Sequence, residues 1–140
     1  SKVQQQVTAS NSQLQQQYDL FSVPLEVGAV AQVNNIYFVA DAAFLQIPSY
    51  PELDKVVAFL QKNKNLKVEI GGHSNGLCDD AFCQKLSTSR AKTCVDYLVS
   101  KGIAASRLSY KGYGKTKLLY PDKPGNPLNQ RVEIKIISIQ

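Results

Sequence analysis

Two stretches of the chain repeat their apolar residues every three or four positions, and this spacing constrains the fold more than any other feature. Residues at that interval lie on one face of an α-helix, so each stretch predicts a helix with a single buried stripe. The stripes are Leu53, Val56, Val57 and Leu60 in the first stretch, and Ala91, Cys94, Val95 and Leu98 in the second. A helix with one apolar face needs another layer to cover it.

The ends of both helices carry recognisable signals. Ser49 is the expected N-cap of the first helix, and Glu52 three residues later completes a capping box. This helix is expected to end around 63–65, where asparagines interrupt the pattern. The second helix is expected to begin at residue 79 or 80 and to run to about 100, with Gly102 as a left-handed stop.

Short alternating segments between the helices predict strands, because side chains on a strand point to opposite faces in turn. The predicted strands cover 33–40, 67–70, 108–110 and 131–139. The order is strand, helix, strand, helix, strand, strand. This βαβαββ order predicts an α/β two-layer sandwich, a mixed sheet with two main helices on one face. Residues 1–20 are rich in glutamine and are interpreted as a linker, which leaves 21–140 as the folded domain.

Composition excludes several classes of protein. The formal net charge is +5, which is compatible with an anionic partner such as nucleic acid. The lysines are spread along the chain without a dense basic block. We therefore expect a solvated basic surface and no nucleic-acid partner. No apolar run approaches the roughly 20 residues that span a bilayer. The chain contains no methionine, which suggests a piece of a longer protein.

The three cysteines predict a disulfide and no metal site. Cys78 and Cys83 are close in the sequence, and a bridge between them would imply an oxidising compartment. No second pair stands at metal-ligand spacing, and His73, the only histidine, is not placed for a zinc knuckle. Cys94 stands apart and is expected to be a small buried apolar residue.

Several motifs occur in one order along the chain. Gly-His-Ser-Asn occupies 72–75, and Leu-Ser-Thr-Ser-Arg-Ala occupies 86–91. Further motifs are Ile-Tyr-Phe at 36–38, Leu-Ser-Tyr-Lys-Gly-Tyr-Gly at 108–114 and Asn-Gln-Arg-Val-Glu at 129–133. In these motifs the chain resembles the OmpA C-terminal family, which includes the peptidoglycan-associated lipoproteins. The resemblance covers about 33–136.

The resemblance implies non-covalent binding of the peptidoglycan stem peptide through the free end of its diaminopimelate residue. That end is a zwitterion, so its site needs an acceptor for the ammonium and a cationic fork for the carboxylate. In the family an acid after Gly-His-Thr takes the first role and a helix arginine the second. The expected peptidoglycan-binding residues are Asn75, Arg90, Ser74, Leu86, Phe38, Val39, Asp41 and Arg131.

The chain also departs from the family pattern. Asn75 stands where the family has an acid, and could be merely a turn residue. Arg90 could be a plain surface arginine, and Arg131 could be either a contact at the rim of the site or a strand charge. Cys78 and Cys83 replace a common Gly and the usual Asn, so we expect their disulfide to pin the binding loop to the start of the helix.

These features predict a peptidoglycan-binding module without catalysis and without a cofactor. The module would tether a larger protein to the cell wall in the periplasm, attached to the outer membrane through the parent protein. The departures are similar to those of modular lipoproteins of Bacteroidota. The alternative is a degenerate OmpA-like domain that acts in protein–protein assembly of an envelope or secretion complex.

Overall fold

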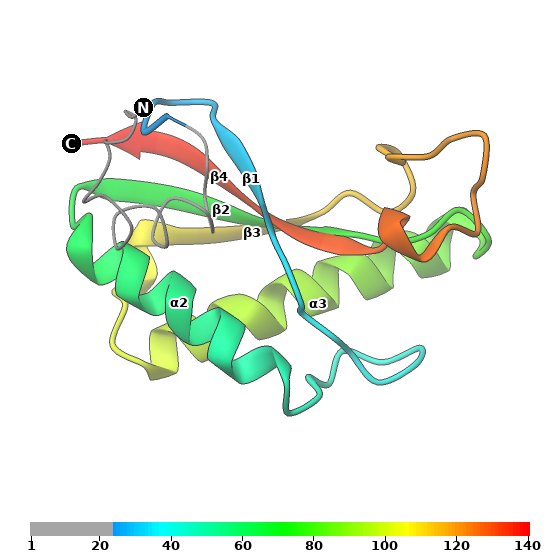
Figure 1. The fold of residues 1–140 in the computed structure, drawn as a ribbon, viewed down its shortest axis with the longest axis horizontal. Coiled ribbons are helices and arrows are strands. Elements are labelled where there is room, and N and C mark those ends of the chain that lie inside the picture. The colour runs from blue at the N-terminus through cyan, green and yellow to red at the C-terminus, as the bar shows by residue number, and fades with distance from the viewer. Residues whose placement is uncertain (1–23) are drawn as a thin grey trace, which may run out of the picture.

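The computed structural model describes residues 24–140, which form a four-stranded sheet and two long helices (Figure 1). The strands are β1 (Val30–Val33), β2 (Leu66–His73), β3 (Leu108–Gly112) and β4 (Arg131–Ile139). The helices are α2 (Ser49–Lys62) and α3 (Asp80–Ser100). Two short 3₁₀ turns, at Ala105–Arg107 and Pro127–Asn129, precede β3 and β4.

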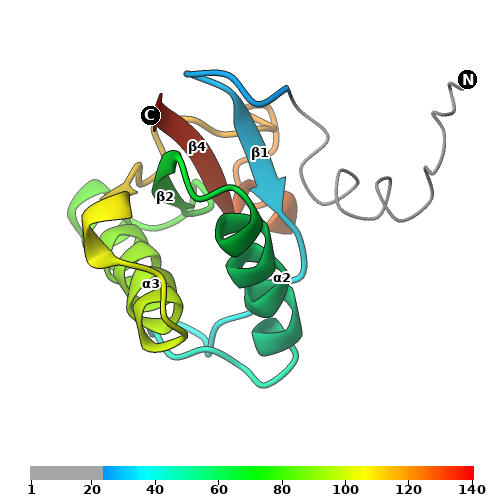
Figure 2. The same cartoon turned by 90° about the vertical axis from the view of Figure 1, so that its left-hand side faces the viewer.

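The sheet is mixed, as predicted. Its strands lie in the order β1–β4–β2–β3, with β2 parallel to β3 and the other neighbours antiparallel. Both helices cover the same face of the sheet (Figure 2). The predicted α/β two-layer sandwich is therefore confirmed, and its order places the end of β2 beside the start of β4.

The core lies between the sheet and the two helices. Both predicted helical stripes are buried there, together with the inward-facing residues of β2 and β4. These inward-facing residues are Leu66, Val68, Ile70, Val132, Ile134 and Ile136. Alternation of apolar and polar residues along β4 therefore gives one covered face and one open face, as expected for a sheet that is covered on one side.

The prediction of a strand over 33–40 is wrong. The first strand is β1 (Val30–Val33), and the chain then turns back on itself, with only an isolated bridge between Phe38 and Leu45. The carbonyl oxygens of this turn accept hydrogen bonds from α3 rather than from a strand: Arg90 donates to Val39 and Ala42, and Thr93 donates to Ala43. We call residues 38–46 the pocket turn.

The capping box predicted at Ser49 is also wrong. Pro48 is the N-cap of α2 and makes no side-chain capping bond. The hydroxyl of Ser49, fully buried, instead accepts from the backbone N–H of Tyr37 at 2.7 Å and donates to its carbonyl at 2.9 Å. The Ser49 hydroxyl is therefore bonded to the backbone of Tyr37 and does not cap the helix.

Other predicted boundaries are confirmed. Asp79 caps α3 by accepting from the N–H of Phe82 at 2.9 Å, and Gly102 has the left-handed φ of 102° that ends the helix. The predicted linker over 1–20 lies outside the described residues. Within 24–140, no helix is long and apolar enough to cross a membrane.

Candidate functional site

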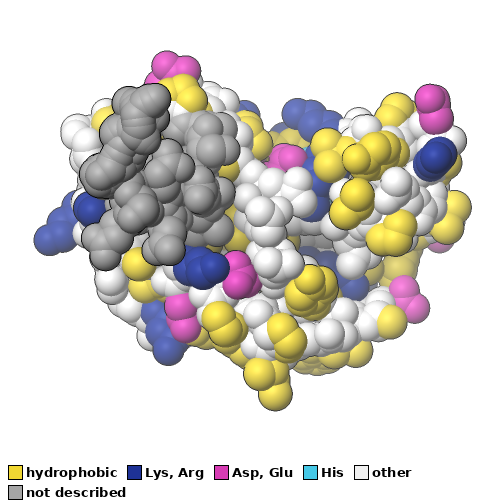
Figure 3. Space-filling model, in the orientation of Figure 1, with side chains coloured by type: hydrophobic (Ala, Val, Ile, Leu, Met, Phe, Trp, Pro, Cys, Tyr) yellow, Lys and Arg dark blue, Asp and Glu magenta, His cyan; other side chains and the backbone are white. Residues whose placement is uncertain are grey.

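A pocket of about 590 Å³ lies between the pocket turn, the loop that follows β2 and the first half of α3. The space-filling view shows this face hollowed between the segment after β1 and the segment before β4 (Figure 3). The lining residues come from four separate parts of the sequence. They are Phe38, Ala40, Asp41, Gln46, Ser74, Asn75, Leu77, Cys78, Phe82, Leu86, Arg90 and Gln130.

Arg90 lines the pocket and holds the pocket turn in place. Its Nε donates to the carbonyl of Ala42 at 2.8 Å, and its Nη2 donates to the carbonyl of Val39 at 3.2 Å. The guanidinium carbon lies 4.8 Å from the centre of the Phe38 ring, a cation–π contact. Burial lowers the pKa of Arg90, and the charge of Asp41 opposes that effect. Among the described residues Nη1 has no hydrogen-bond partner, so one nitrogen of the fork is available to a ligand.

The loop after β2 forms a second wall. The N–H of Ser74 donates to the carbonyl of Gly114 at 2.9 Å, and the N–H of Gly76 donates to the carbonyl of Pro124 at 2.7 Å. Between them, Oδ1 of Asn75 accepts from the N–H of Leu77 at 2.9 Å. Asn75 is therefore the turn residue that its type suggests, and it also lines the pocket.

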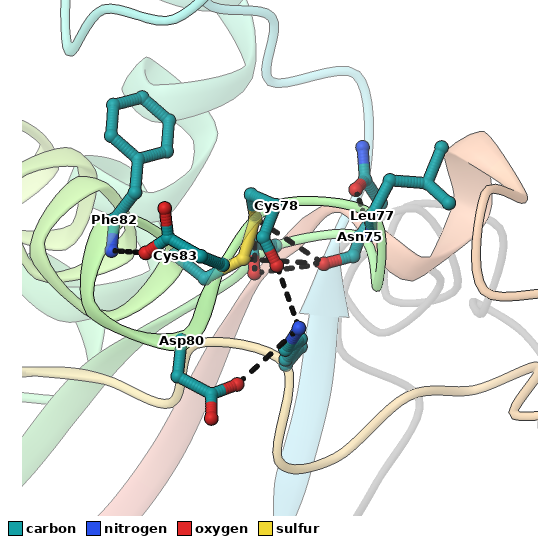
Figure 4. A network of polar contacts seen from close by, with 9 residues as sticks. Asn75, Leu77, Cys78, Asp80, Phe82 and Cys83 are labelled. Atoms are coloured by element: carbon teal, nitrogen blue, oxygen red, sulfur yellow. Dashed lines mark hydrogen bonds and ion pairs between the residues drawn. A yellow bond between two sulfur atoms is a disulfide. The ribbon is translucent and has the colours of Figure 1, made fainter.

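The structure pairs Cys78 with Cys83, so the predicted disulfide is present (Figure 4). The bridge joins the loop after β2 to the first turn of α3. Both sulfurs lie within 3.8 Å of the carbonyl oxygen of Asn75. These are packing contacts and not hydrogen bonds, because a disulfide sulfur carries no hydrogen. The ammonium of Lys115 donates to the carbonyl of Cys78 at 2.6 Å and lies 3.3 Å from Asp80. Cys94 is buried, as predicted, and burial raises the pKa of its thiol to about 12.

Removing the disulfide by the double change Cys78→Ala and Cys83→Ala is expected to lower the free energy of unfolding by about 2 kcal/mol, from the loop entropy of a short bridge. Urea denaturation at neutral pH measures the difference. Wild-type protein in a reducing agent is the control, since it should approach the stability of the variant. Equal stability of the oxidised wild type and the variant would contradict the stapling role.

Arg131 lies outside the pocket lining and is committed to its neighbours. Its Nε donates to the carboxylate of Glu133, Nη1 to the carbonyl of Asn129 and Nη2 to the carbonyl of Lys117, all at 2.8–2.9 Å. Asn129, fully buried, accepts from the N–H of Tyr120 at 2.8 Å and donates to the carbonyl of Lys123 at 3.1 Å. Arg131 thus supports the loop that carries Gln130 into the pocket.

The buried His73 pairs with the partly exposed Glu133 on the helix-free face of the sheet. Nε2 of His73 lies 3.0 Å from Oε1 of Glu133, and the ring stacks on Tyr113 with centroids 4.8 Å apart. The hydrogen bond with His73 is the largest cause that lowers the pKa of Glu133. Burial raises this pKa and the contact with Arg131 lowers it further, so that it falls to about 2. His73 is therefore packed beside the site, not in it.

The lowered pKa of Glu133 predicts a pH dependence of stability. The carboxylate stabilises the fold fully above its unfolded pKa of 4.5, and this contribution is lost as the pH falls from there toward 2. The variant Glu133→Gln lacks the titrating group. The gap in melting temperature between wild type and variant should therefore be largest at pH 7 and shrink by pH 2.5. A gap that stays constant over this range would contradict the assignment.

Six of the eight residues expected from the sequence line the pocket, namely Phe38, Asp41, Ser74, Asn75, Leu86 and Arg90. Val39 contributes its carbonyl to Arg90, and its side chain, 44% exposed, is not in the lining. Of the six other lining residues, Cys78 was expected only as a disulfide partner, and five were not expected: Ala40, Gln46, Leu77, Phe82 and Gln130. The position of Gln130 beside Arg131 in the last motif is the one signal that could have indicated it.

One protein family matches most of the chain. The family model described as the OmpA family matches residues 37–131. The photosystem I P700 chlorophyll a apoprotein A2 of Gloeobacter violaceus is 41% identical over 110 residues, which are 73% of this chain and 13% of that protein. Outer membrane porin F of Pseudomonas fluorescens is 30% identical over 104 residues, 73% of this chain and 32% of the porin. The chain thus spans about a third or less of these relatives.

Among solved structures, the OmpA-like domain of FopA1 from Francisella tularensis superposes with a TM-score of 0.65 at 25% identity, covering 82% of this chain and 84% of that one. The two chains therefore share one fold over most of their lengths. None of these relatives shows that the chain comes from a member of the Bacteroidota, so this origin stays a prediction.

Proposed function

Because this chain belongs to the OmpA family, we propose that it binds peptidoglycan without catalysis and anchors a larger envelope protein to the cell wall. The ligand is the stem peptide, held through the free end of its diaminopimelate residue. The site consists of Arg90, Asn75, Ser74, Asp41 and the apolar side chains of Phe38 and Leu86.

One observation carries this proposal: residues that lie far apart in the sequence meet in a single pocket, around an arginine with one nitrogen that no residue of 24–140 occupies. A carboxylate that reaches Nη1 of the buried Arg90 side chain gains a charged hydrogen bond, which is stronger than a neutral one. Because the turn carbonyls already hold the other nitrogens, the guanidinium is fixed before the ligand arrives, and little freedom is lost on binding.

Further features support binding without catalysis in an oxidising compartment outside the cytoplasm. His73, the only histidine, lies against Glu133 and Tyr113 rather than in the pocket. The Cys78–Cys83 bridge is typical of proteins outside the reducing cytoplasm. We therefore place the domain in the periplasm, attached to the outer membrane through its parent protein.

A second candidate is a protein–protein assembly module that has lost wall binding. It is favoured by two apolar side chains at the pocket, Leu77 and Phe82, which are 73% and 42% exposed. It is also favoured by the neutral Asn75 at the position of the family acid. Exposed apolar groups of this kind are common where proteins dock.

Cosedimentation with purified sacculi separates these candidates. The proposed function predicts that the domain pellets with sacculi and is displaced by the soluble tripeptide L-alanyl-γ-D-glutamyl-meso-diaminopimelate. A domain that stays in the supernatant would contradict wall binding and favour the assembly module. Release of soluble muropeptides during the incubation would instead reveal an enzyme.

A further inference from the structure

The pocket has one acidic and one basic side chain among its lining residues, Asp41 and Arg90. They come from different elements: Asp41 lies in the pocket turn, and Arg90 lies on α3 and donates to the carbonyls of Val39 and Ala42 on either side of Asp41. A pocket with one charge of each sign matches a zwitterion. The question is which residue takes each end of it.

Asn75 presents a donor to the pocket. Its Oδ1 accepts from the N–H of Leu77 at 2.9 Å, and a backbone N–H requires the oxygen, not the amide nitrogen, on that side. The amide nitrogen then lies on the other side, and Figure 4 shows no dashed line reaching it. Within the described part of the chain Nδ2 has no partner. Asn75 therefore has an unused donor for a carboxylate, whereas one of the two lone pairs of its oxygen is already occupied.

Asp41 presents a carboxylate to the same pocket. It sits at the tip of the pocket turn with a φ of 56°, a left-handed conformation that Asp tolerates better than most residues. The turn is closed by the N–H of Val39 donating to the carbonyl of Phe44 at 2.8 Å, and Arg90 and Thr93 tie it to α3. The Asp41 side chain has no hydrogen bond or ion pair with any described residue, so its carboxylate is available.

We infer that Asp41 binds the ammonium of the ligand and that Asn75, together with Nη1 of Arg90, binds its carboxylate. This inference rests on the proposed function and goes beyond it, because it fixes the direction in which the zwitterion lies. The charge absent at position 75 is supplied from the opposite wall of the pocket, and position 75 changes from an acceptor to a donor.

Two charge variants give opposite predictions for the competing arrangements. Asn75→Asp keeps an oxygen for the N–H of Leu77 and places a second carboxylate oxygen where the amide nitrogen was. If Asn75 donates to the ligand carboxylate, this change weakens binding of the tripeptide about tenfold through repulsion and a lost donor. If position 75 instead faces the ammonium, the same change strengthens binding. Asp41→Asn, which also tolerates the left-handed turn, is expected to weaken binding about tenfold.

The test is a calorimetric titration with the meso-diaminopimelate tripeptide and with the same peptide acetylated only on the free amine of its diaminopimelate residue. Wild type should prefer the free amine about tenfold, and Asp41→Asn should lose that preference. Tighter binding by Asn75→Asp, or unchanged discrimination in Asp41→Asn, would overturn the inference while leaving the proposed function intact. A wild-type domain that binds neither peptide would contradict the proposed function itself, and the inference with it.

Discussion

Replacing Arg90 with alanine is expected to weaken binding to sacculi about 100-fold, which corresponds to about 3 kcal/mol. The change removes the only basic side chain among the described residues that line the pocket, and with it the charged hydrogen bond to the ligand carboxylate. It also frees the carbonyls of Val39 and Ala42, so the wall that carries Asp41 loses its support. Cosedimentation at increasing amounts of sacculi measures the loss.

Two control variants separate contact with the ligand from general damage. Arg107→Ala removes an arginine that also holds backbone carbonyls, those of Leu60, Asn63 and Leu66, but lies outside the pocket lining. Thr93→Val removes the hydrogen bond to Ala43 and so loosens the pocket turn without touching the pocket. Both should bind sacculi within about threefold of wild type, since neither removes a charged contact to the ligand. A loss as large in Thr93→Val as in Arg90→Ala would mean that Arg90 acts only through the turn.

Replacing Gly112 with alanine is expected to be strongly damaging, lowering the free energy of unfolding by about 3 kcal/mol. An added Cβ would lie 2.4 Å from the backbone nitrogen of Thr88 and 2.7 Å from the hydroxyl of Ser87. Backbone atoms of a helix cannot yield separately, so α3 as a whole would have to move away from β3. Urea denaturation measures the loss.

Ser109→Ala is the matched control for Gly112→Ala, because it places the same methyl group on an exposed position of β3. It should be nearly neutral. The displaced helix in Gly112→Ala also carries Leu86 and Arg90, so tripeptide binding should fall together with stability. A variant as stable as wild type would contradict the close packing of α3 on β3.

The helices and the last strand could be predicted from the sequence because their signals are local. Burial of the two apolar stripes follows from spacing within one helix, and the cap at Asp79 and the stop at Gly102 act within a single turn. The disulfide could be predicted for a related reason: its cysteines are five residues apart, and one of them lies in a loop. Each of these features depends on residues that are near neighbours in the chain.

The pocket turn could not be predicted, since its partners lie about 50 residues away. Alternation of Ile36 and Phe38 suits a strand as well as it suits an extended entry to a turn. Arg90 and Thr93 stabilise the turn conformation through hydrogen bonds to this segment that span 48 to 51 residues. Ser49 shows the same limit, because its hydroxyl serves the backbone of Tyr37 instead of its own helix.

The most direct test of the central claim is an NMR titration of the ¹⁵N-labelled domain with the meso-diaminopimelate tripeptide. We predict saturable shifts that centre on the amides of Asp41 and Asn75 and on the Nε of Arg90, with the amides of β4 around Lys135 unchanged. Shifts centred on the helix-free face of the sheet would contradict the pocket assignment. An absence of shifts at millimolar peptide would contradict stem-peptide binding altogether.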